Sequence, residues 1–440
     1  WGMTRMRRKS FLAVLSLLLT VVFLFSCAHS KRPTDVSNQA ASEPAQPISF
    51  RITWTDYSGR GQAILKIVND YNTSQPGAAV QLLGGDEDEE TIRALLASQP
   101  ETVFVLPYRY VQYFGDLGSL LDLSETFAAE QPLFYPAIWK LGTMGGKTYG
   151  IPWLGHSMCL LYNKSLLKEA GVDPDSIQNL NAFVAALKRV EQNTQARGIG
   201  LVGAESNDVS WMVNQFVYGF GGRLVNDAGT QVAVNSPQAR TAIDFYKNVL
   251  GAHAQPTWTE DTGVEVMEAF RKQQVAFEIQ GIWGITDVQK NGSPFEVGAI
   301  ALKDIGLYAE VGPMMLSIPS GMSEGGREQA VSFIRYLISK DAQEQILNGE
   351  YSVEHDTYYP FRTPIRTDMA DMPLAQMNPV YQVFIEGFEQ PSVDVPVPAW
   401  QTVKSALYEP GLHLVMTGEL SIPDFLAQME TEGNRILAAQ

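Results

Sequence analysis

Two kinds of hydrophobic period alternate between residues 48 and 106, and this alternation constrains the fold more than any other feature. The first apolar residues occupy every second position, as in a strand with one buried face: Ile48, Phe50, Ile52 and Trp54. A helix is expected from Ser58 to the Pro76-Gly77 stop, a strand at 80–83, a helix carrying Ile92, and a buried strand at 103–106. This order predicts a parallel sheet with helices on both faces.

The same alternation returns later in the chain. Ser236-Pro237 begins a helix, the strand 275–279 ends at Gln280-Gly281, and Val331 and Ile334 lie on a long amphipathic helix. Ser421 and Asp424 form a capping box before a closing helix. We therefore expect an α/β protein of two lobes with a helical C-terminal part.

The N-terminus has the features of an export signal. Arg5, Arg7, Arg8 and Lys9 precede an apolar run from Phe11 to Phe25, which Leu24-Phe25-Ser26-Cys27 closes. The arrangement resembles a bacterial lipoprotein signal peptide, 1–26, after which Cys27 is lipidated. A membrane-spanning helix is the alternative, but the run is shorter than the ~20 residues that a span needs. Residues 27–47 then form the lipidated cysteine and a flexible tether.

The chain is strongly acidic. It holds 32 Lys and Arg against 48 Asp and Glu, a formal net charge of −16, and losing the four cations of the signal makes this −20. A surface of this sign excludes nucleic acid as an expected partner. The acidic run 86–90 lacks the alternating ligands and glycine of a calcium loop, so it is assigned to a helix start.

Cysteine and histidine positions indicate neither disulfides nor metals. If Cys27 carries lipid, Cys159 is the one remaining cysteine, and its apolar neighbours predict a buried, inert thiol. The histidines are scattered without metal-ligand spacing: His29, His156, His253, His355 and His413. We expect no metal and no cofactor.

Two stretches resemble catalytic motifs but lack essential parts. Residues 141–148 nearly spell a phosphate-binding loop, yet Leu141 replaces its first glycine and no helix can follow. Residues 155–159 lack the last glycine of a nucleophile elbow. A pair of His156 and Cys159 is not expected, because residues three apart on a strand face opposite sides.

Several longer segments carry a family resemblance. GKTYGIPW at 146–153, followed by LLYNKSLLKEAGVDP at 160–174, resembles the signature region of the family 1 extracellular solute-binding proteins of ABC importers, the maltose-binding-protein relatives. Further matching segments occur in the family's order: TWTDYSG, WMVNQFVYGFGGRLVND, FRKQQVAFEIQGIWGI, AVSFIRYLISKDAQEQIL, YYPFRTPIRTD and PVPAWQTVKSAL. The resemblance covers nearly all of the mature chain and is specific to the family, though not to a ligand.

The resemblance implies a two-lobed periplasmic-binding-protein fold of type II-like topology, with discontinuous lobes. It places three hinge crossings, near 154–158, 297–303 and 351–359. The N-lobe is then expected to contain 48–155 and 302–352, and the C-lobe 156–301 and 353–440. In this family the ligand lies in the cleft between the lobes, at the carboxyl ends of parallel strands.

The matching segments also supply candidate ligand contacts. They are Asp56, Tyr57, Tyr108, Arg109, Trp153, His156, Asn207, Asp208, Trp211, Trp283, Arg362 and Trp400. Aromatic rings stack on the C–H face of a sugar, and the polar groups bind its hydroxyls. Trp283 and Trp400 match family positions that stack on sugars, whereas Trp139, Tyr149 and Phe220 are assigned to the core. His156 stands where the maltose binder has an acidic residue, which argues against maltose itself.

The resemblance implies a monomeric, non-enzymatic, lipid-anchored protein outside the cytoplasm, on the periplasmic face of a membrane or at the cell surface. It is expected to capture a sugar or oligosaccharide by hinge closure and deliver it to an ABC permease, with no membrane contact other than the lipid. Two alternatives remain. Arg109 and Arg362 also suit glycerol 3-phosphate or a glycerophosphodiester. An anchored glycoside hydrolase requires paired carboxylates, which any two of the 48 acids could form.

Overall fold

The computed structural model describes residues 46–52, 59–75, 77, 79–85, 89–360, 362–377, 379–393 and 397–439. These residues belong to one compact unit that begins at Pro44. The predicted signal, Cys27 and the tether lie outside them, and so do Asp56 and Tyr57.

A five-stranded sheet forms the first lobe. Its strand order is β2 (Val80–Gly84), β1 (Ile48–Ile52), β3 (Thr102–Pro107), β12 (Met314–Ser317) and β6 (Ile151–Leu154). β1 pairs in parallel with β2 and β3, whereas β12 is antiparallel to β3 and β6. The helices α1 (Gly59–Ser74) and α2 (Glu89–Ser98) connect the first three strands, and α11 (Glu324–Leu337) also packs on this lobe. The predicted strand and helix order is confirmed.

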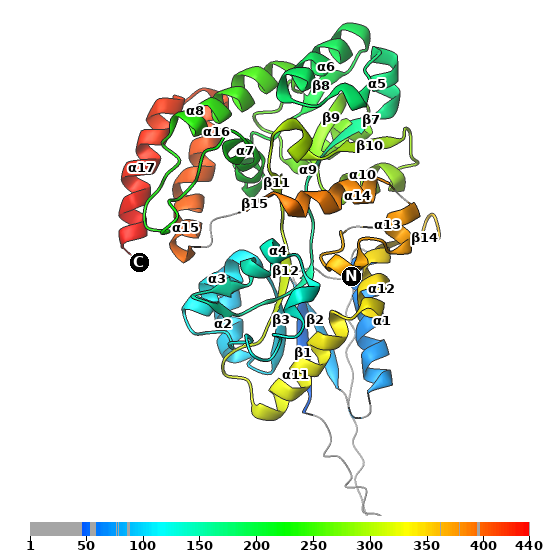
Figure 1. Ribbon diagram of the computed structural model, residues 1–440, viewed down its shortest axis with the longest axis vertical. Helices are drawn as coiled ribbons and strands as arrows, with labels where there is room; N and C mark the ends of the chain where they lie inside the picture. Colours follow the sequence, from blue (N-terminus) through cyan, green and yellow to red (C-terminus); the bar gives the residue numbers. More distant parts are fainter. Residues whose placement is uncertain are drawn as a thin grey trace, which may run out of the picture. The chain divides into compact units, whose positions relative to one another are not determined.

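A four-stranded sheet forms the second lobe (Figure 1). Its order is β10 (Val297–Ile300), β7 (Cys159–Asn163), β9 (Val275–Gln280) and β8 (Arg197–Gly200). Surrounding helices are α5 (Lys164–Ala170), α6 (Leu180–Asn193), α7 (Asn207–Gly219), α8 (Pro237–Asp244), α9 (Gly263–Arg271) and α10 (Ile282–Lys290). Capping side chains mark the N-termini of two of these helices by accepting hydrogen bonds from backbone N–H groups of the first turn. Asn163 caps α5, and Thr262 forms a capping box with Glu265 at α9.

The first connection between the two sheets lies between β6 and β7. Before the second crossing, residues 297–300, which the prediction assigns to the C-lobe, form β10 and pair with β7. The chain next forms β11 (Ala309–Glu310) and enters the five-stranded sheet only at Met314. The predicted boundary at residue 302 is therefore too early.

The third connection is also longer than predicted. The hairpin of β13 (Glu350–Ser352) and β14 (Thr357–Tyr359) packs on α1 of the first lobe. Short helices α13 (Pro373–Met377) and α14 (Val380–Glu386) follow, and the chain then pairs with β11 through β15 (Pro391–Ser392). Ile365, Phe384 and Phe388 in this connection join the same hydrophobic cluster as the first sheet.

The C-terminal helices cover the second lobe. These are α15 (Pro398–Val403), α16 (Glu409–Thr417) and α17 (Ile422–Ala438). Helix α16 packs against α7, α17 packs against α8, and α15 packs against α17. Ser421 accepts from the Asp424 N–H and caps α17, as its motif predicts. The remaining larger helices are α3 (Tyr108–Asp116), α4 (Pro136–Leu141) and α12 (Lys340–Asn348).

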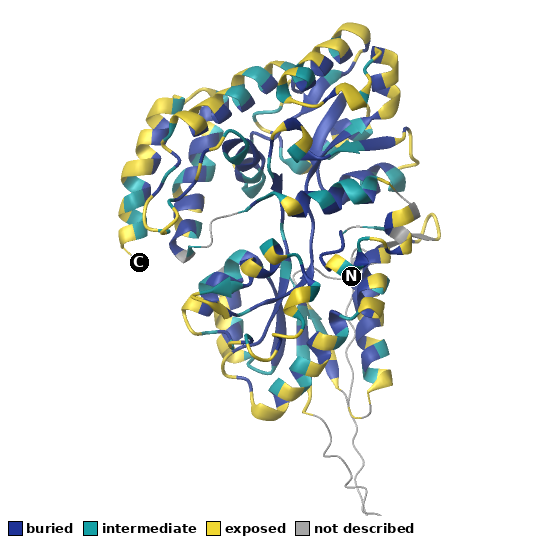
Figure 2. Cartoon of the chain, in the orientation of Figure 1, coloured by how far each residue is buried: buried dark blue, intermediate teal, exposed yellow. Residues whose placement is uncertain are grey.

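Both sheets are buried between their helices (Figure 2). Cys159 in β7 is fully buried, and burial raises the pKa of its thiol well above the usual value, as expected of an inert cysteine. Among the described residues, no helix is long and apolar enough to cross a membrane. The same residues contain no group of three or more His, Cys, Asp or Glu side chains that could hold a metal.

Candidate ligand site

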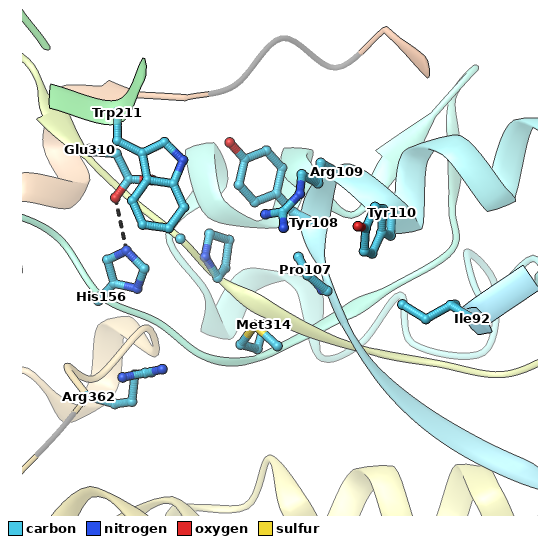
Figure 3. A pocket seen from close by; sticks show the side chains of 12 residues that line it. Ile92, Pro107, Tyr108, Arg109, Tyr110, His156, Trp211, Glu310, Met314 and Arg362 are labelled. Carbon is cyan, nitrogen blue, oxygen red and sulfur yellow. Dashed lines mark hydrogen bonds and ion pairs between the residues drawn. The ribbon is translucent and has the colours of Figure 1, made fainter. Parts of the chain in front are cut away.

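A cavity of about 310 Å³ lies where the crossing segments meet the carboxyl end of β3 (Figure 3). Its lining combines aromatic, charged and apolar side chains: Ile92, Pro107, Tyr108, Arg109, Tyr110, His156, Trp211, Glu310, Gly312, Pro313, Met314 and Arg362. The first lobe supplies Tyr108 to Tyr110, and α7 of the second lobe supplies Trp211. Five of the twelve predicted contacts therefore come together at this one cavity: Tyr108, Arg109, His156, Trp211 and Arg362.

The turn from β3 into α3 places three of these side chains. Pro107 is extended, with φ −57° and ψ 143°, and α3 begins directly after it. The turn therefore presents Tyr108, Arg109 and Tyr110 at the carboxyl end of a parallel strand, where α/β proteins bind ligands. The Arg109 guanidinium lies 4.9 Å from the Tyr110 ring centroid, which orients its planar group by a cation–π contact.

Two crossing segments run side by side behind the cavity. The Gly312 N–H donates to the His156 carbonyl at 3.2 Å, and the Met158 N–H donates to the Glu310 carbonyl at 2.9 Å. His156 Nε2 lies 2.9 Å from Glu310 Oε2, and both side chains are buried. Position 312 must be glycine, because an added Cβ there lies 2.1 Å from His156 Cε1.

Two tryptophans surround the His156 ring. The Trp283 ring meets it edge-on with centroids 4.9 Å apart, and the Trp211 centroid is 6.3 Å away. Trp283 Nε1 donates to Gln280 Oε1 at 2.8 Å, and the Arg362 guanidinium carbon lies 5.7 Å from the Trp283 ring. Trp211 lines the cavity, whereas Trp283 packs behind His156.

The structure places four predicted contacts elsewhere. Asn207 accepts from the buried Lys404 ammonium, and Asp208 accepts from the Gly263 N–H at 3.0 Å, which satisfies the first turn of α9. Trp153 and Trp400 are fully buried in hydrophobic clusters and do not line the cavity. Trp153 belongs to a short strand whose residues are all buried, and Trp400 packs on Tyr408, with ring centroids 5.6 Å apart.

Sequence reasoning missed Tyr110, Glu310, Gly312 and Met314. A signal for Glu310 exists: it is the one charged residue between positions 305 and 320, in an otherwise apolar and small-residue stretch. A charged residue in a buried run requires a partner and often marks a functional site. His156 is that partner, and no spacing rule connects residues 154 positions apart.

Two sheets, joined by crossing segments that meet at a cavity lined from both lobes, define a two-lobed binding protein. Residues 66–382 match the family model of bacterial extracellular solute-binding proteins, and the chain belongs to this family.

Individual relatives are distant. The chain is 27% identical over 236 residues to a probable ABC transporter-binding protein of Deinococcus radiodurans, covering 51% of this chain and 55% of the relative. It is 26% identical over 243 residues to the diacetylchitobiose binding protein DasA of Streptomyces coelicolor, covering 54% of each. The chain thus spans about half the length of these relatives.

A solved structure extends the comparison to nearly the whole chain. Maltose-bound MalE3 of T. maritima superimposes with a TM-score of 0.75 at 19% identity, over 89% of this chain and 99% of that one. This likeness shows the two-lobed periplasmic-binding-protein fold.

Proposed function

We propose that this protein is the solute-binding component of an ABC importer and captures a sugar or oligosaccharide in the cavity. The observation that carries the proposal is the lining itself: Tyr108 and Tyr110 from one lobe and Trp211 from the other share one cavity with Arg109 and Glu310. Rings of this kind stack on sugar C–H faces, and the charged groups satisfy hydroxyls in a site that excludes water. A probable ABC transporter-binding protein and a diacetylchitobiose binding protein among the relatives support the assignment.

Hinge closure is the proposed mechanism of capture. A solute that contacts both Tyr108 and Trp211 binds more tightly when the lobes are closed, so it shifts the population toward that state. The permease then recognises the closed form. The paired crossing segments at His156 and Gly312 are suited to act as the hinge, since they connect the two sheets.

The anchor and the location rest on the N-terminal sequence. Lipidation of Cys27 after removal of 1–26 holds the protein outside the cytoplasm, with 28–47 as a tether between the membrane and the first strand. The protein is then a monomer that diffuses along the membrane to its permease.

A glycerol phosphate or glycerophosphodiester is the second candidate ligand. Arg109 and Arg362 both line the cavity. A guanidinium group can donate two parallel hydrogen bonds to two oxygens of one phosphate. Binding of this ligand depends mainly on positively charged hydrogen-bond donors, whereas binding of a sugar depends on aromatic rings that stack on it.

Glycoside hydrolysis is not favoured. That reaction uses two carboxyl groups about 5–10 Å apart around the bond to be cleaved. Among the described residues, Glu310 is the one carboxylate that lines the cavity, and it is already bonded to His156.

The test is a titration of the purified protein with mono- and oligosaccharides, polyols and glycerol phosphates, followed by tryptophan fluorescence with chromatography of the ligand afterwards. Saturable one-to-one binding of a sugar that is recovered unchanged supports the proposal. Consumption of the sugar contradicts it, and binding of glycerol phosphates alone selects the second candidate.

A further inference from the structure

The buried His156–Glu310 pair in the cavity lining leaves one ring nitrogen without a partner in the part of the chain that the structure describes. The His156 and Glu310 side chains are 10% and 4% exposed and bond through Nε2 and Oε2. His156 Nδ1 is buried and has no hydrogen-bond partner among the residues that the structure describes. Such atoms are rare in native proteins because desolvation is not offset, which indicates that Nδ1 gains a partner in the functional state.

The pair determines which kind of partner fits. An ionised carboxylate can only accept hydrogen bonds, so Glu310 requires the imidazole proton to be on Nε2. In the neutral ring, Nδ1 then carries a lone pair and acts as an acceptor. The Gly312 backbone, packed against the ring, and the edge-on Trp283 prevent the ring from turning over.

The His156 ring forms part of the cavity wall, and its Nδ1 is itself buried. In Figure 3 the Nδ1 side of the ring is turned away from Glu310, toward the side where Arg362 lies. The charged lining residues among those described are Arg109, Arg362 and Glu310.

We propose that Glu310 is a positioning residue that holds His156 as a hydrogen-bond acceptor, so that Nδ1 accepts from a hydroxyl group of the captured solute. The inference rests on the proposed function and deepens it. It makes a free hydroxyl the group that this wall recognises, because a phosphate or carboxylate oxygen has no proton to donate.

Two replacements of His156 separate its nitrogens. His156→Asn places an amide oxygen near the Nδ1 position, whereas His156→Gln keeps an N–H donor near Nε2 for Glu310 but removes the acceptor. Binding of maltose, lactose and N,N′-diacetylchitobiose is measured by calorimetry at pH 8. We expect His156→Gln to weaken the affinity about tenfold, and the affinity of His156→Asn to stay within about threefold of that of the wild type. Equal losses in both variants overturn the acceptor role.

A second His–Glu pair provides the matched control. His253 Nδ1 lies 2.7 Å from Glu191 Oε2, and neither residue lines the cavity. Glu191→Gln removes the same type of contact and should leave sugar affinity unchanged. Glu310→Gln should weaken binding severalfold, because a neutral amide can stabilise either imidazole tautomer.

Nitrogen NMR of histidine-labelled protein tests the tautomer without any sugar. The His156 signal is identified as the one that is missing from the spectrum of His156→Asn. At pH 8 this signal should have the chemical shifts of an imidazole protonated at Nε2 in the wild type. In Glu310→Gln it should shift toward those of an imidazole protonated at Nδ1. A ring protonated at Nδ1 in the wild type refutes the inference. If the tautomer is as proposed and none of the sugars binds, the sugar assignment fails instead.

Discussion

Glu278 in β9 carries a buried carboxyl group that has no hydrogen-bond partner among the residues the structure describes. The residue is fully buried, and neither carboxyl oxygen has a hydrogen-bond partner among the described residues. It packs against α10, where a Cβ added at Gly284 would lie 2.8 Å from Glu278 Oε1. Burial raises its pKa well above the usual value, and the negative charge of Asp287 contributes in the same direction.

The sign of the pH effect follows from this raised pKa. A carboxyl whose folded pKa exceeds its unfolded value binds its proton more tightly in the folded protein, so its contribution is fully present below about pH 4.3. Above that pH the unfolded chain ionises and the folded chain does not. The free energy of unfolding then falls by about 1.4 kcal/mol per pH unit until the folded pKa is reached.

The substitution Glu278→Gln tests this argument, because glutamine keeps the shape of the side chain but cannot ionise. We expect the variant and the wild type to be similar near pH 4, and the variant to become progressively more stable than wild type as the pH rises above 5, by at most the ~1.4 kcal/mol per pH unit that one proton sets. Urea unfolding followed by circular dichroism at several pH values measures the difference. Glu169→Gln, an exposed position on α5, is the control. Parallel stability profiles for Glu278→Gln and wild type would refute the argument.

Three further predictions concern the cavity and the core. Trp211→Ala should weaken binding of the best sugar about tenfold with little change in stability, measured by calorimetry and urea unfolding, and an unchanged affinity would remove Trp211 from the site. Gly312→Ala forces the His156 ring to move and should weaken the same binding, whereas unchanged affinity would show that the ring tolerates the methyl group. Trp400→Ala should cost about 3–5 kcal/mol of stability, because its ring is fully buried, and a variant as stable as wild type would contradict its place in the core.

The part of the fold that was predicted correctly depends on local patterns. Strand β1 has a clear period of two, β3 is a short continuous apolar run, the helices between them have a period of 3.6, and α17 begins at its capping motif. The boundary at residue 302 was placed too early because the chain forms β11, which pairs with the distant β15, before it enters the first sheet at Met314.

The site was predicted less completely, for a different reason. Trp211 and Trp400 are the same residue type, yet Trp211 lines the cavity and Trp400 in α15 is buried in the hydrophobic cluster of the second lobe. Glu310 was missed because its function depends on His156, which lies close to it only after both crossings have formed. Contacts between distant segments determine such roles, and no local period reports them.

The most direct test of solute capture between the lobes is calorimetry with one aromatic residue removed from each wall. Maltose, lactose, N,N′-diacetylchitobiose and their longer oligosaccharides are titrated into wild type, Tyr108→Ala, Trp211→Ala and the double variant. We predict one-to-one binding to wild type and a large loss in each single variant, with the double variant losing less than the sum, since both rings hold one solute. Undiminished binding in the double variant would contradict a site at this cavity.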